Sequence, residues 1–543
     1  MSQTAASGQK ASGAHHHAAP RRSLVDYKSS VTEKFLFFAV LLGGLIFTGV
    51  SIWSDISASG VNTLAILPFI LLVLALLIAL GFEFVNGFHD TANAVATVIY
   101  TNSLPAQFAV VWSGAWNFLG VLASSGAVAF GIVSLLPVEL ILNVGSGSGM
   151  AMVFALLIAA IIWNLGTWAL GLPASSSHTL IGSIIGVGLA NQFVQGADGT
   201  SGVDWGQAAN VGYSLLFSPI IGFFAAGLLL ITLKVMVRNP ALYREPEGRK
   251  PPPWWIRGLL VLTCTGVSFA HGSNDGQKGM GLIMLILIGI VPTAYALNRA
   301  VNVEEVAQFR SIARATETAL IAASGTTPAP ADPRATLTVF VRDHVASPEV
   351  LPALAQVTRE ISDMVGAHDT LAQVPAASVS NMRNDMYLAS ETIRVMNRIS
   401  APAVNFELHE DLTAFKQRLD TATKFIPLWV KVSVALALGL GTMVGWKRIV
   451  VTVGEKIGKT HLTYAQGGAA EVVAMVTIGA ADMYGLPVST TQVLSSGVAG
   501  TMAANKSGLQ MSTVRNLMMA WVLTLPAAIA LSGGLYLLLR HIM

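Results

Sequence analysis

Long apolar stretches alternate with shorter polar ones along most of the chain. Each apolar stretch is close to the roughly 17 to 25 residues that a helix needs to cross a bilayer. The ten stretches lie at about 35–53, 62–82, 107–133, 150–171, 211–237, 256–270, 277–297, 427–446, 467–484 and 516–539. The pattern predicts an all-α polytopic membrane protein with ten to twelve membrane helices, some of them broken by polar residues.

Composition agrees with a membrane protein. Of the 543 residues, 53% are hydrophobic and 11% are charged, and the mean hydropathy is +0.62, whereas a soluble domain carries about 25% charged residues. Cys264 is the single cysteine, which excludes a disulfide within the chain. The sequence contains no Walker loop, zinc-ligand spacing or serine-hydrolase elbow, so it predicts neither an ATP-driven pump nor an enzyme.

Changes in polarity divide the chain into segments. A tail rich in Ala, Ser and Gly lacks the apolar content to order itself, and a long polar segment late in the chain predicts an inserted soluble domain that is mainly helical. The predicted segments are a disordered tail (1–34), an extra N-terminal helix (35–60), a first repeat (61–237), a basic linker (238–257), the first part of a second repeat (258–297), the insert (298–425) and the rest of the second repeat (426–543).

The charges of the loops predict the orientation. Basic residues cluster before the first apolar run, at 238–257 and at 447–459. Since cytoplasmic loops are enriched in Lys and Arg, all three clusters, and the N-terminus with them, are expected in the cytoplasm. The insert is one membrane crossing away from two of these loops, which predicts a periplasmic position.

Two pairs of polar motifs indicate an internal repeat. NGFHDTANAV at 86–95 aligns with HGSNDGQKGM at 271–280, and GLPASSSHTL at 171–180 aligns with GLPVSTTQVL at 485–494. The second motif pair is 129 residues further apart than the first, which matches the length of the insert. Because the loop charges predict that the two copies run in opposite directions, the chain is expected to be an inverted-repeat secondary transporter with broken or re-entrant helices.

Hydroxyl residues follow a proline in both GLP motifs. Proline suits the first turn of a helix, and hydroxyl groups beside that turn add donors to the free backbone N–H groups. Two such helix starts could hold one tetrahedral oxyanion from both sides. The alternative is that these hydroxyl groups only cap helices. The candidate anion-binding residues are Ser175, Ser176, Ser177, Ser489, Thr490 and Thr491.

Asp90 and Asp275 are the carboxylates of the other motif pair. A charged side chain inside a bilayer is costly, so both are expected to face a cavity and to bind a cation, a proton or a basic side chain. Asn93 aligns with Lys278, which lies three residues after Asp275 and can reach it on one helix. This lysine could replace a bound cation, which favours protons as the coupling ion. Further candidates for ion coupling are Glu83 and Glu471.

Several polar residues near the motifs have a simpler interpretation. His89, His178 and His271 could titrate near neutral pH, but a histidine in such a place more often serves as a hydrogen-bonding side chain. Asn117 and Asn164 are as readily explained by bonds between helices as by a role in transport.

The four motifs resemble those of the inorganic phosphate transporter (PiT) family, in which the duplicated signature usually reads GANDxANA. The resemblance covers roughly 62–296 and 427–540. It implies import of inorganic phosphate through inverted repeats, driven by a sodium or proton gradient. By position, it assigns Asp90, Asn93, Asp275 and the two hydroxyl clusters to the site for phosphate and coupling ion; Lys278 is added on its chemistry.

Departures from the common signature are informative. FHD replaces AND in the first motif, and Gln277 and Lys278 replace part of the second. These changes resemble the bacterial low-affinity, proton-coupled branch, which implies an inner-membrane location and uptake of phosphate with Mg²⁺ or another divalent cation as a neutral complex. In that case Asp90 and Asp275 would also contact the metal, and no further cofactor is implied.

Three alternatives remain open at this stage. Coupling could be to Na⁺, or the substrate could be another tetrahedral oxyanion, with arsenate expected as a mimic of phosphate. The chain could instead be a membrane-anchored receptor or sensor, although an anchor does not need buried charge. The expected partners are phosphate and the lipid bilayer, with no nucleic acid; a homodimer is an open alternative to a monomer.

Overall fold

The computed structural model describes residues 30–59, 66–136, 141–142, 144–195, 203–246, 248, 250–399 and 406–543. The side chains of 91–93, 195 and 406–407 are not described, so Asn93 and most of the predicted tail lie outside the described part. The α-helices are α1 (Val31–Ala58), α2 (Ile66–Tyr100), α3 (Ala106–Ala123), α4 (Ala127–Val133), α6 (Gly147–Ala169), α7 (Ser176–Gln195), α8 (Trp205–Met236), α9 (Trp254–Ile290), α10 (Pro292–Tyr295), α11 (Val303–Ser324), α12 (Pro333–Asp343), α13 (Val350–Gly366), α14 (Ala376–Ile399), α15 (Phe406–Thr423), α16 (Leu428–Thr442), α17 (Lys447–Val451), α18 (Tyr464–Met483), α19 (Thr490–Ala504) and α20 (Met511–Leu539). No named strand occurs in these ranges, which confirms the all-α prediction.

Six of the described helices are long and apolar enough to cross a membrane, or seven if α15 and α16 form one bent span. They are α1, α2, α3, α6, α8 and α20. Three other helices of the bundle do not meet this test of length and apolar character. Helices α7 and α9 carry polar motifs, and α19 has only 15 residues. The predicted total of ten to twelve membrane helices therefore stays a prediction.

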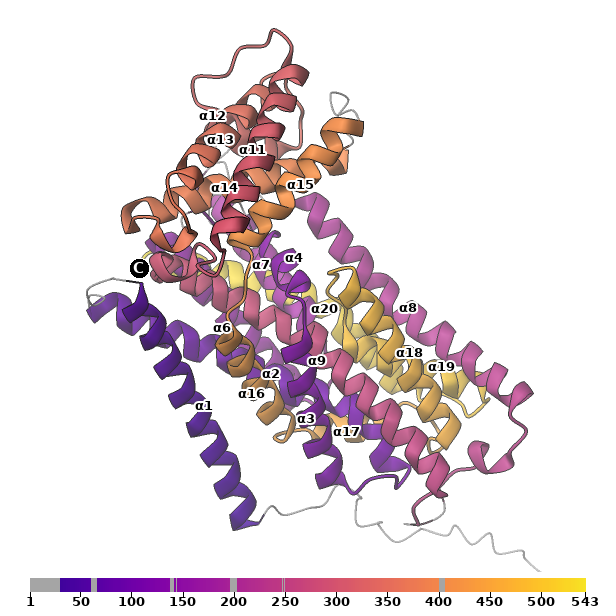
Figure 1. The fold of residues 1–543 in the computed structure, drawn as a ribbon. Coiled ribbons are helices and arrows are strands. Elements are labelled where there is room, and N and C mark those ends of the chain that lie inside the picture. Colours follow the sequence, from indigo (N-terminus) through magenta and orange to yellow (C-terminus); the bar gives the residue numbers. More distant parts are fainter. Residues whose placement is uncertain are drawn as a thin grey trace, which may run out of the picture.

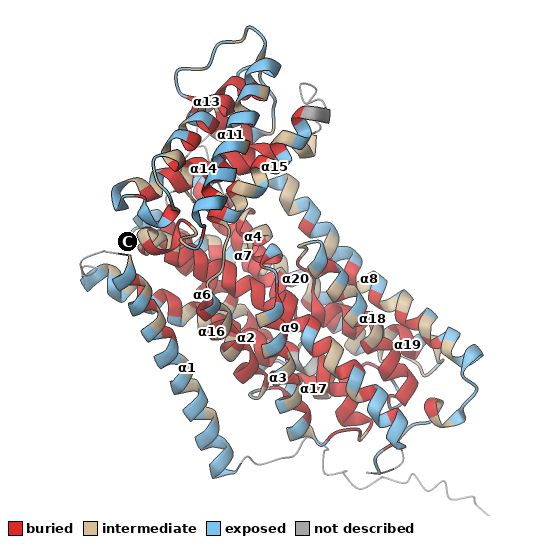
Figure 2. Ribbon diagram, in the orientation of Figure 1, coloured by how far each residue is buried: buried red, intermediate tan, exposed pale blue. Residues whose placement is uncertain are grey.

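The first helix lies at the edge of the bundle (Figure 1). Only 6% of its most apolar window is buried, and Figure 2 shows most of its length as exposed. It contacts α16 through a hydrogen bond of 2.6 Å between the hydroxyl groups of Thr48 and Ser433. Asp55, near its end, accepts hydrogen bonds from Tyr295 and Trp429, both at 2.9 Å. A long apolar face that the protein leaves uncovered suits a helix in contact with lipid.

Helix pairs repeat across the molecule. α3 packs on α9 as α16 packs on α2, and α7 packs on α20 as α19 packs on α8. A Cβ atom on Gly272 would lie 2.1 Å from the backbone oxygen of Asn117, and one on Gly87 would lie 2.2 Å from that of Leu438. Both glycines therefore allow the same close approach between backbones. The predicted alignment of Gly87 with Gly272 is confirmed by these equivalent contacts.

The two motif helices cross each other in opposite directions. Glu83, early in the polar part of α2, lies against Gly279, late in that of α9. Glu471 is a hydrogen-bond partner of two threonines, Thr97 and Thr263. Thr97 lies later in α2 than Glu83, and Thr263 lies earlier in α9 than Gly279. The order of contacts is therefore reversed between the helices, as the inverted repeat requires.

Helices α11 to α15 form a separate group at one end of the bundle (Figure 1). The aromatic rings of Phe309 and Phe415 pack edge to face within its core, with centroids 5.8 Å apart. The two ends of the segment meet where the backbone N–H of Asn298 donates to the oxygen of Ala422 at 2.8 Å. Adjacent ends are what an insertion between two halves of a fold needs. The predicted insert at 298–425 thus coincides with a compact group of helices, and its periplasmic position stays a prediction.

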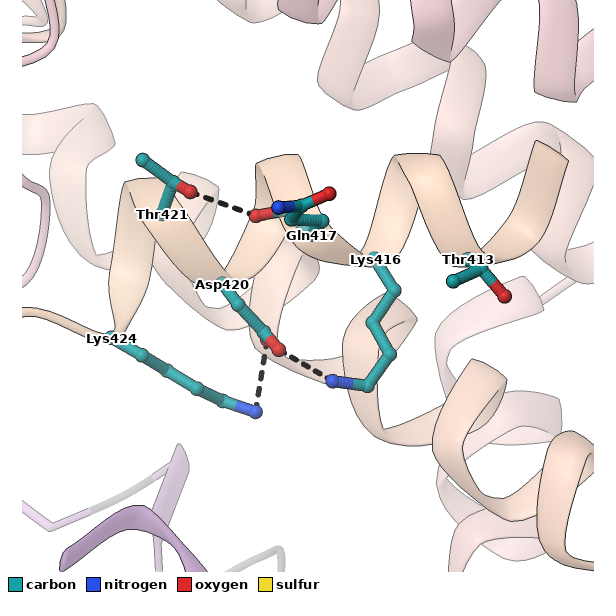
Figure 3. Close-up of a pocket in the computed structure, with 6 residues that line it drawn as sticks. All are labelled: Thr413, Lys416, Gln417, Asp420, Thr421 and Lys424. Atoms are coloured by element: carbon teal, nitrogen blue, oxygen red, sulfur yellow. Dashed lines mark hydrogen bonds and ion pairs between the residues drawn. The ribbon is translucent and has the colours of Figure 1, made fainter. Parts of the chain in front are cut away.

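A groove of about 450 Å³ runs over α15 on the surface of this group (Figure 3). Asp420 lies at its centre and pairs with Lys416 and with Lys424, the second pair at 2.9 Å. Both lysine side chains thus already have a carboxylate partner. The groove is distant in sequence from the polar motifs, which come together inside the bundle.

Candidate functional site

Both GLP motifs form the same local structure. Gly171 and Gly485 have φ angles of +67° and +65°, a left-handed conformation that favours glycine. Each is followed by a proline and a helix start, at which Ser175 Oγ accepts from His178 N and Ser489 Oγ accepts from Gln492 N, both at 3.2 Å. The prediction that the hydroxyl clusters stand at helix starts is confirmed. One hydroxyl of each cluster serves as the N-cap, which leaves the following ones to reach other partners.

The two helix starts meet over Asp90. Ser176 Oγ, on α7, lies 2.8 Å from Asp90 Oδ2, and Thr491, on α19, donates to the other oxygen of the same carboxylate. Ser177 Oγ donates to the backbone oxygen of Val488 at 2.7 Å, which joins the two starts directly. Residues that are 86 and 401 positions from Asp90 in sequence thus converge on one side chain.

Asp275 and Lys278 complete the cluster from α9. Lys278 Nζ lies 2.7 Å from Asp275 Oδ2, a contact that the spacing of three residues predicted. It also donates to Ser177 Oγ at 2.6 Å. Ser176 Oγ is 3.4 Å from Asp275 Oδ2 and so lies between the two carboxylates. Lys278 and Asp275 are both completely buried. An ammonium group in this place offsets part of the charge that two buried carboxylates would otherwise concentrate.

His271 joins the two aspartates. Its Nε2 is 3.6 Å from Asp275 Oδ2 and 4.0 Å from Asp90 Oδ2, while Nδ1 is 2.8 Å from Asn117 Oδ1. Asp90, His271 and Asp275 each offer a ligand atom within 4.8 Å of the others, a grouping that could hold a metal ion. Within the described residues, His271 Nε2 and Asp275 Oδ1 have no hydrogen-bond partner. Such orphaned polar atoms indicate a place for a ligand.

Residues 86–532 of the chain match the "Phosphate transporter family". The chain belongs to this family. It is 44% identical over 484 residues to the "Low-affinity inorganic phosphate transporter PitA" of Escherichia coli K12, covering 86% of this chain and 96% of that protein. PitB of the same organism is 43% identical over 487 residues with the same coverage. A solved structure, "The sodium-dependent phosphate transporter", has 20% identity and a TM-score of 0.48, covering 87% of this chain and 100% of its own.

The resemblance seen in the four motifs is therefore confirmed. The relatives are named transporters, which supports a transport role rather than an enzymatic one. Together with the membrane-length helices, this makes the chain a multi-pass membrane protein of the phosphate transporter family.

In this phosphate transporter family member, the remaining predicted residues fall into separate places. Ser175 and Ser489 cap their helices, and Thr490 is buried without a hydrogen-bond partner for its hydroxyl among the described residues. Glu83 lies beside the cluster, where Asn86 Nδ2 donates to it at 3.4 Å. Glu471 lies apart, bonded to threonines of α2 and α9. The structure thus brings together Asp90, Asp275, Lys278, Ser176, Ser177 and Thr491.

Sequence reasoning missed two contributors. His271 was interpreted as a hydrogen-bonding side chain, yet its spacing of four residues before Asp275 on one helix was the available signal. Asp482 was not singled out at all. Its carboxylate accepts from Ser273 Oγ and Gln277 Nε2, both at 2.6 Å, and so ties the segment before Ser489 to α9. Nothing in the local sequence around Asp482 identifies these partners, which are more than 200 residues away.

Proposed function

We propose that this protein imports inorganic phosphate across the bacterial cytoplasmic membrane by proton-coupled symport, with its N-terminus in the cytoplasm. The supporting observation is the pairing of Lys278 with both Asp275 and Ser177. A fixed ammonium group beside the carboxylate takes the place that a sodium ion would otherwise fill. Family membership and the relatives' names support phosphate as the substrate.

Phosphate would bind between the starts of α7 and α19. Ser176, Ser177 and Thr491 now donate to groups of the protein itself. When phosphate enters, these hydroxyl groups would turn to its oxygens, and Lys278 would supply the positive charge. Asn93, at the pseudo-equivalent position, would add an amide from the other repeat. These contacts within the protein are thus exchanged for contacts with the substrate.

Phosphate would travel with a divalent cation as a neutral complex. Asp90, His271 and Asp275 already place three ligand atoms within 4.8 Å of one another. Carboxylate oxygens are ligands that Mg²⁺ prefers. The cation is cargo in this scheme and leaves with the phosphate, so it adds to the positive charge of Lys278 beside the buried aspartates only during the transport cycle.

Protons would be carried by Glu83 and Glu471. Each is completely buried and has one carboxylate oxygen, Oε1, without a partner among the described residues. A buried carboxyl group is most easily accommodated in its protonated form. Glu83 lies beside the cluster of Asp90, Asp275 and Lys278, whereas Glu471 contacts Thr97 of α2 and Thr263 of α9. In this scheme the protonation of either glutamate changes when phosphate binds or leaves.

Uptake into liposomes is the deciding experiment. Purified protein should accumulate labelled phosphate under an inward proton gradient without sodium, and faster when Mg²⁺ is present with the phosphate. Uptake that strictly requires sodium would contradict proton coupling and would identify sodium as the coupling ion. Arsenate should compete, whereas competition by sulfate at equal strength would identify a general oxyanion carrier.

A second measurement separates transport from a receptor role. Asp275→Asn should abolish uptake in the same liposomes while the protein stays folded, because the substitution removes the partner of Lys278. Asp363→Asn, which changes an exposed carboxylate of the insert, is the matched control. Absence of any uptake by the unmodified protein, together with specific phosphate binding, would favour the receptor.

A further inference from the structure

Arg383, on α14 of the insert, is a buried guanidinium that forms no ion pair within the described part of the chain. Its side chain is 5% exposed. Nη1 donates to the backbone oxygen of Ile141 at 3.4 Å and to Asn384 Oδ1 at 3.2 Å, and both acceptors are neutral. Nε is buried with no hydrogen-bond partner in the described part of the chain. The ring of Tyr387 lies 4.8 Å from the guanidinium carbon and offers the remaining contact.

Two carboxylates of the described chain near Arg383 are engaged with other cations. Glu391, two turns along α14, pairs with Arg394 at 2.6 Å and with Lys424 at 3.4 Å. Asp385 pairs with Arg334 at 2.7 Å. Burial lowers the pKa of Arg383, although Tyr387 and Glu391 act in the opposite direction, and arginine stays charged in proteins. Because an unpaired buried charge is strongly destabilising, this guanidinium requires an anion.

A cavity of about 240 Å³ lies next to this side chain, between the insert and the bundle. Arg383 shares its wall with Ser380 and Asn384, which stand three residues before it and one after it on α14, and with Ser146 at the start of α6. The opposite wall is apolar and comes from the ends of α9 and α10, including Ile288 and Pro292. Hydroxyl and amide groups around a guanidinium match the oxygens of a phosphate group.

We propose that this cavity binds a phosphate group, with Arg383 as its counter-ion and Ser380, Asn384 and Ser146 as further hydrogen-bonding partners. The group belongs either to free inorganic phosphate or to a phospholipid headgroup, since both present the same oxygens. The site is separate from the cluster at Asp90 and Asp275 and uses none of its residues. An anion bound there would join the insert to the ends of α6 and α9 by neutralising the charge of Arg383.

The groove on α15 provides a contrast (Figure 3). Its two lysines both pair with Asp420, so that an anion arriving there would have to displace an existing carboxylate. At the cavity, by contrast, Arg383 forms no ion pair with the described residues, so an arriving anion displaces no carboxylate among them.

Two variants test the site in the full-length protein. Arg383→Gln removes the charge. Ser380→Asp places a carboxylate one helical turn from Arg383, where it can replace the anion without leaving an unpaired charge. Both should weaken anion binding by about tenfold or more. Arg383→Gln loses the charged hydrogen-bond donor, and the carboxylate of Ser380→Asp occupies the guanidinium and repels the anion. Arg359→Gln, on the exposed side of the insert, is the matched control.

Two measurements distinguish the sources of the phosphate group. Equilibrium dialysis of delipidated protein against labelled inorganic phosphate gives the number of phosphate ions bound per chain. If both variants bind one phosphate ion fewer than the unmodified protein and the control, the ligand is free phosphate. Native mass spectrometry after incubation with phosphatidylglycerol vesicles gives retained lipid; one fewer lipid in both variants identifies a headgroup. Equal phosphate and equal lipid in all four proteins would overturn the proposal. Ser380→Asp should also raise the thermal midpoint in the absence of anions, which an unrelated structural role of Arg383 does not explain.

Discussion

Lys278 Nζ lies 2.7 Å from Asp275 Oδ2 at the place where α9 crosses α2. The two residues are three positions apart on one helix, so their contact is local, whereas the residues around them come from distant parts of the chain. Ser177 from α7 accepts from the same ammonium group, and Ser176 places its hydroxyl between Asp275 and Asp90. One lysine thus connects the charged helix of one repeat with the hydroxyl-rich helix start of the other.

Replacing this lysine should change the ion requirement. We expect Lys278→Asn, which copies the residue aligned with it at position 93, to lower proton-driven uptake by about 100-fold or more, because Asp275 is left as a buried unpaired charge. Added sodium or magnesium should restore part of the rate by filling the vacated place. Liposome uptake under defined ion gradients measures both effects.

Lys234→Asn is the control, since Lys234 lies at the exposed end of α8 and contacts Asn505. Equal uptake by Lys278→Asn and this control without added cations would contradict a role for Lys278 as a built-in cation.

The hydroxyl group of Ser176 should contribute to phosphate affinity. It contacts the carboxylates of both Asp90 and Asp275. We expect Ser176→Ala to raise the KM for phosphate by about tenfold or more, because one hydrogen bond to a charged group is lost. Ser183→Ala is a control on the same helix, as Ser183 donates to the backbone oxygen of Thr179. A KM that rises equally in both variants would assign the effect to α7 as a whole.

Backbone packing at Gly272 should be essential to the crossing of the helices. A Cβ atom there would lie 2.1 Å from the backbone oxygen of Asn117, which no side-chain rotation can relieve. We expect Gly272→Ala to lower the free energy of unfolding by about 1–3 kcal/mol, measured as a lower thermal midpoint in detergent. Gly258→Ala on the same helix is the control, because a Cβ there meets no atom within 4 Å in the described chain. A similar change in both would refute the packing argument.

Docking of the insert should depend on Asp204 and on pH. Asp204 caps α8 and pairs with Arg394 at 2.8 Å and with Arg398 at 3.3 Å. Burial alone would raise the pKa of Asp204, but these guanidinium groups and the Gln207 N–H together hold it below its ordinary value of 3.8. A lowered pKa in the folded state means that the pairing stabilises the docked insert above about pH 3.8 and is lost as the pH falls through the lower value.

At neutral pH, Asp204→Asn should therefore loosen the insert, at a cost of about 3 kcal/mol. Hydrogen exchange of α14 in the full-length protein measures the loss of protection, and Asp363→Asn is the control. Unchanged protection in Asp204→Asn at neutral pH would mean that other contacts hold the insert in place.

Much of the fold and part of the site could be predicted from local patterns. Apolar runs indicated membrane helices, and the paired motifs predicted an inverted repeat, with which the reversed order of contacts between α2 and α9 agrees. The helix starts at the GLP motifs were predictable because glycine, proline and a capping hydroxyl act within a few residues. Lys278 and Asp275 were predictable as a pair for the same reason, since the spacing on one helix determines whether two side chains can meet.

The sequence by itself therefore determined the helices, the repeat and the residue types that gather at its centre, because helical spacing, capping and burial of apolar surface act locally. Only the tertiary structure decided which of these residues meet. Ser176 and Thr491 reach Asp90, whereas Ser175 and Ser489 cap their helices. His271 joins the aspartates, and Glu471 lies apart from them. These outcomes depend on how closely backbones approach where helices cross, and that distance is set by contacts between segments hundreds of residues apart.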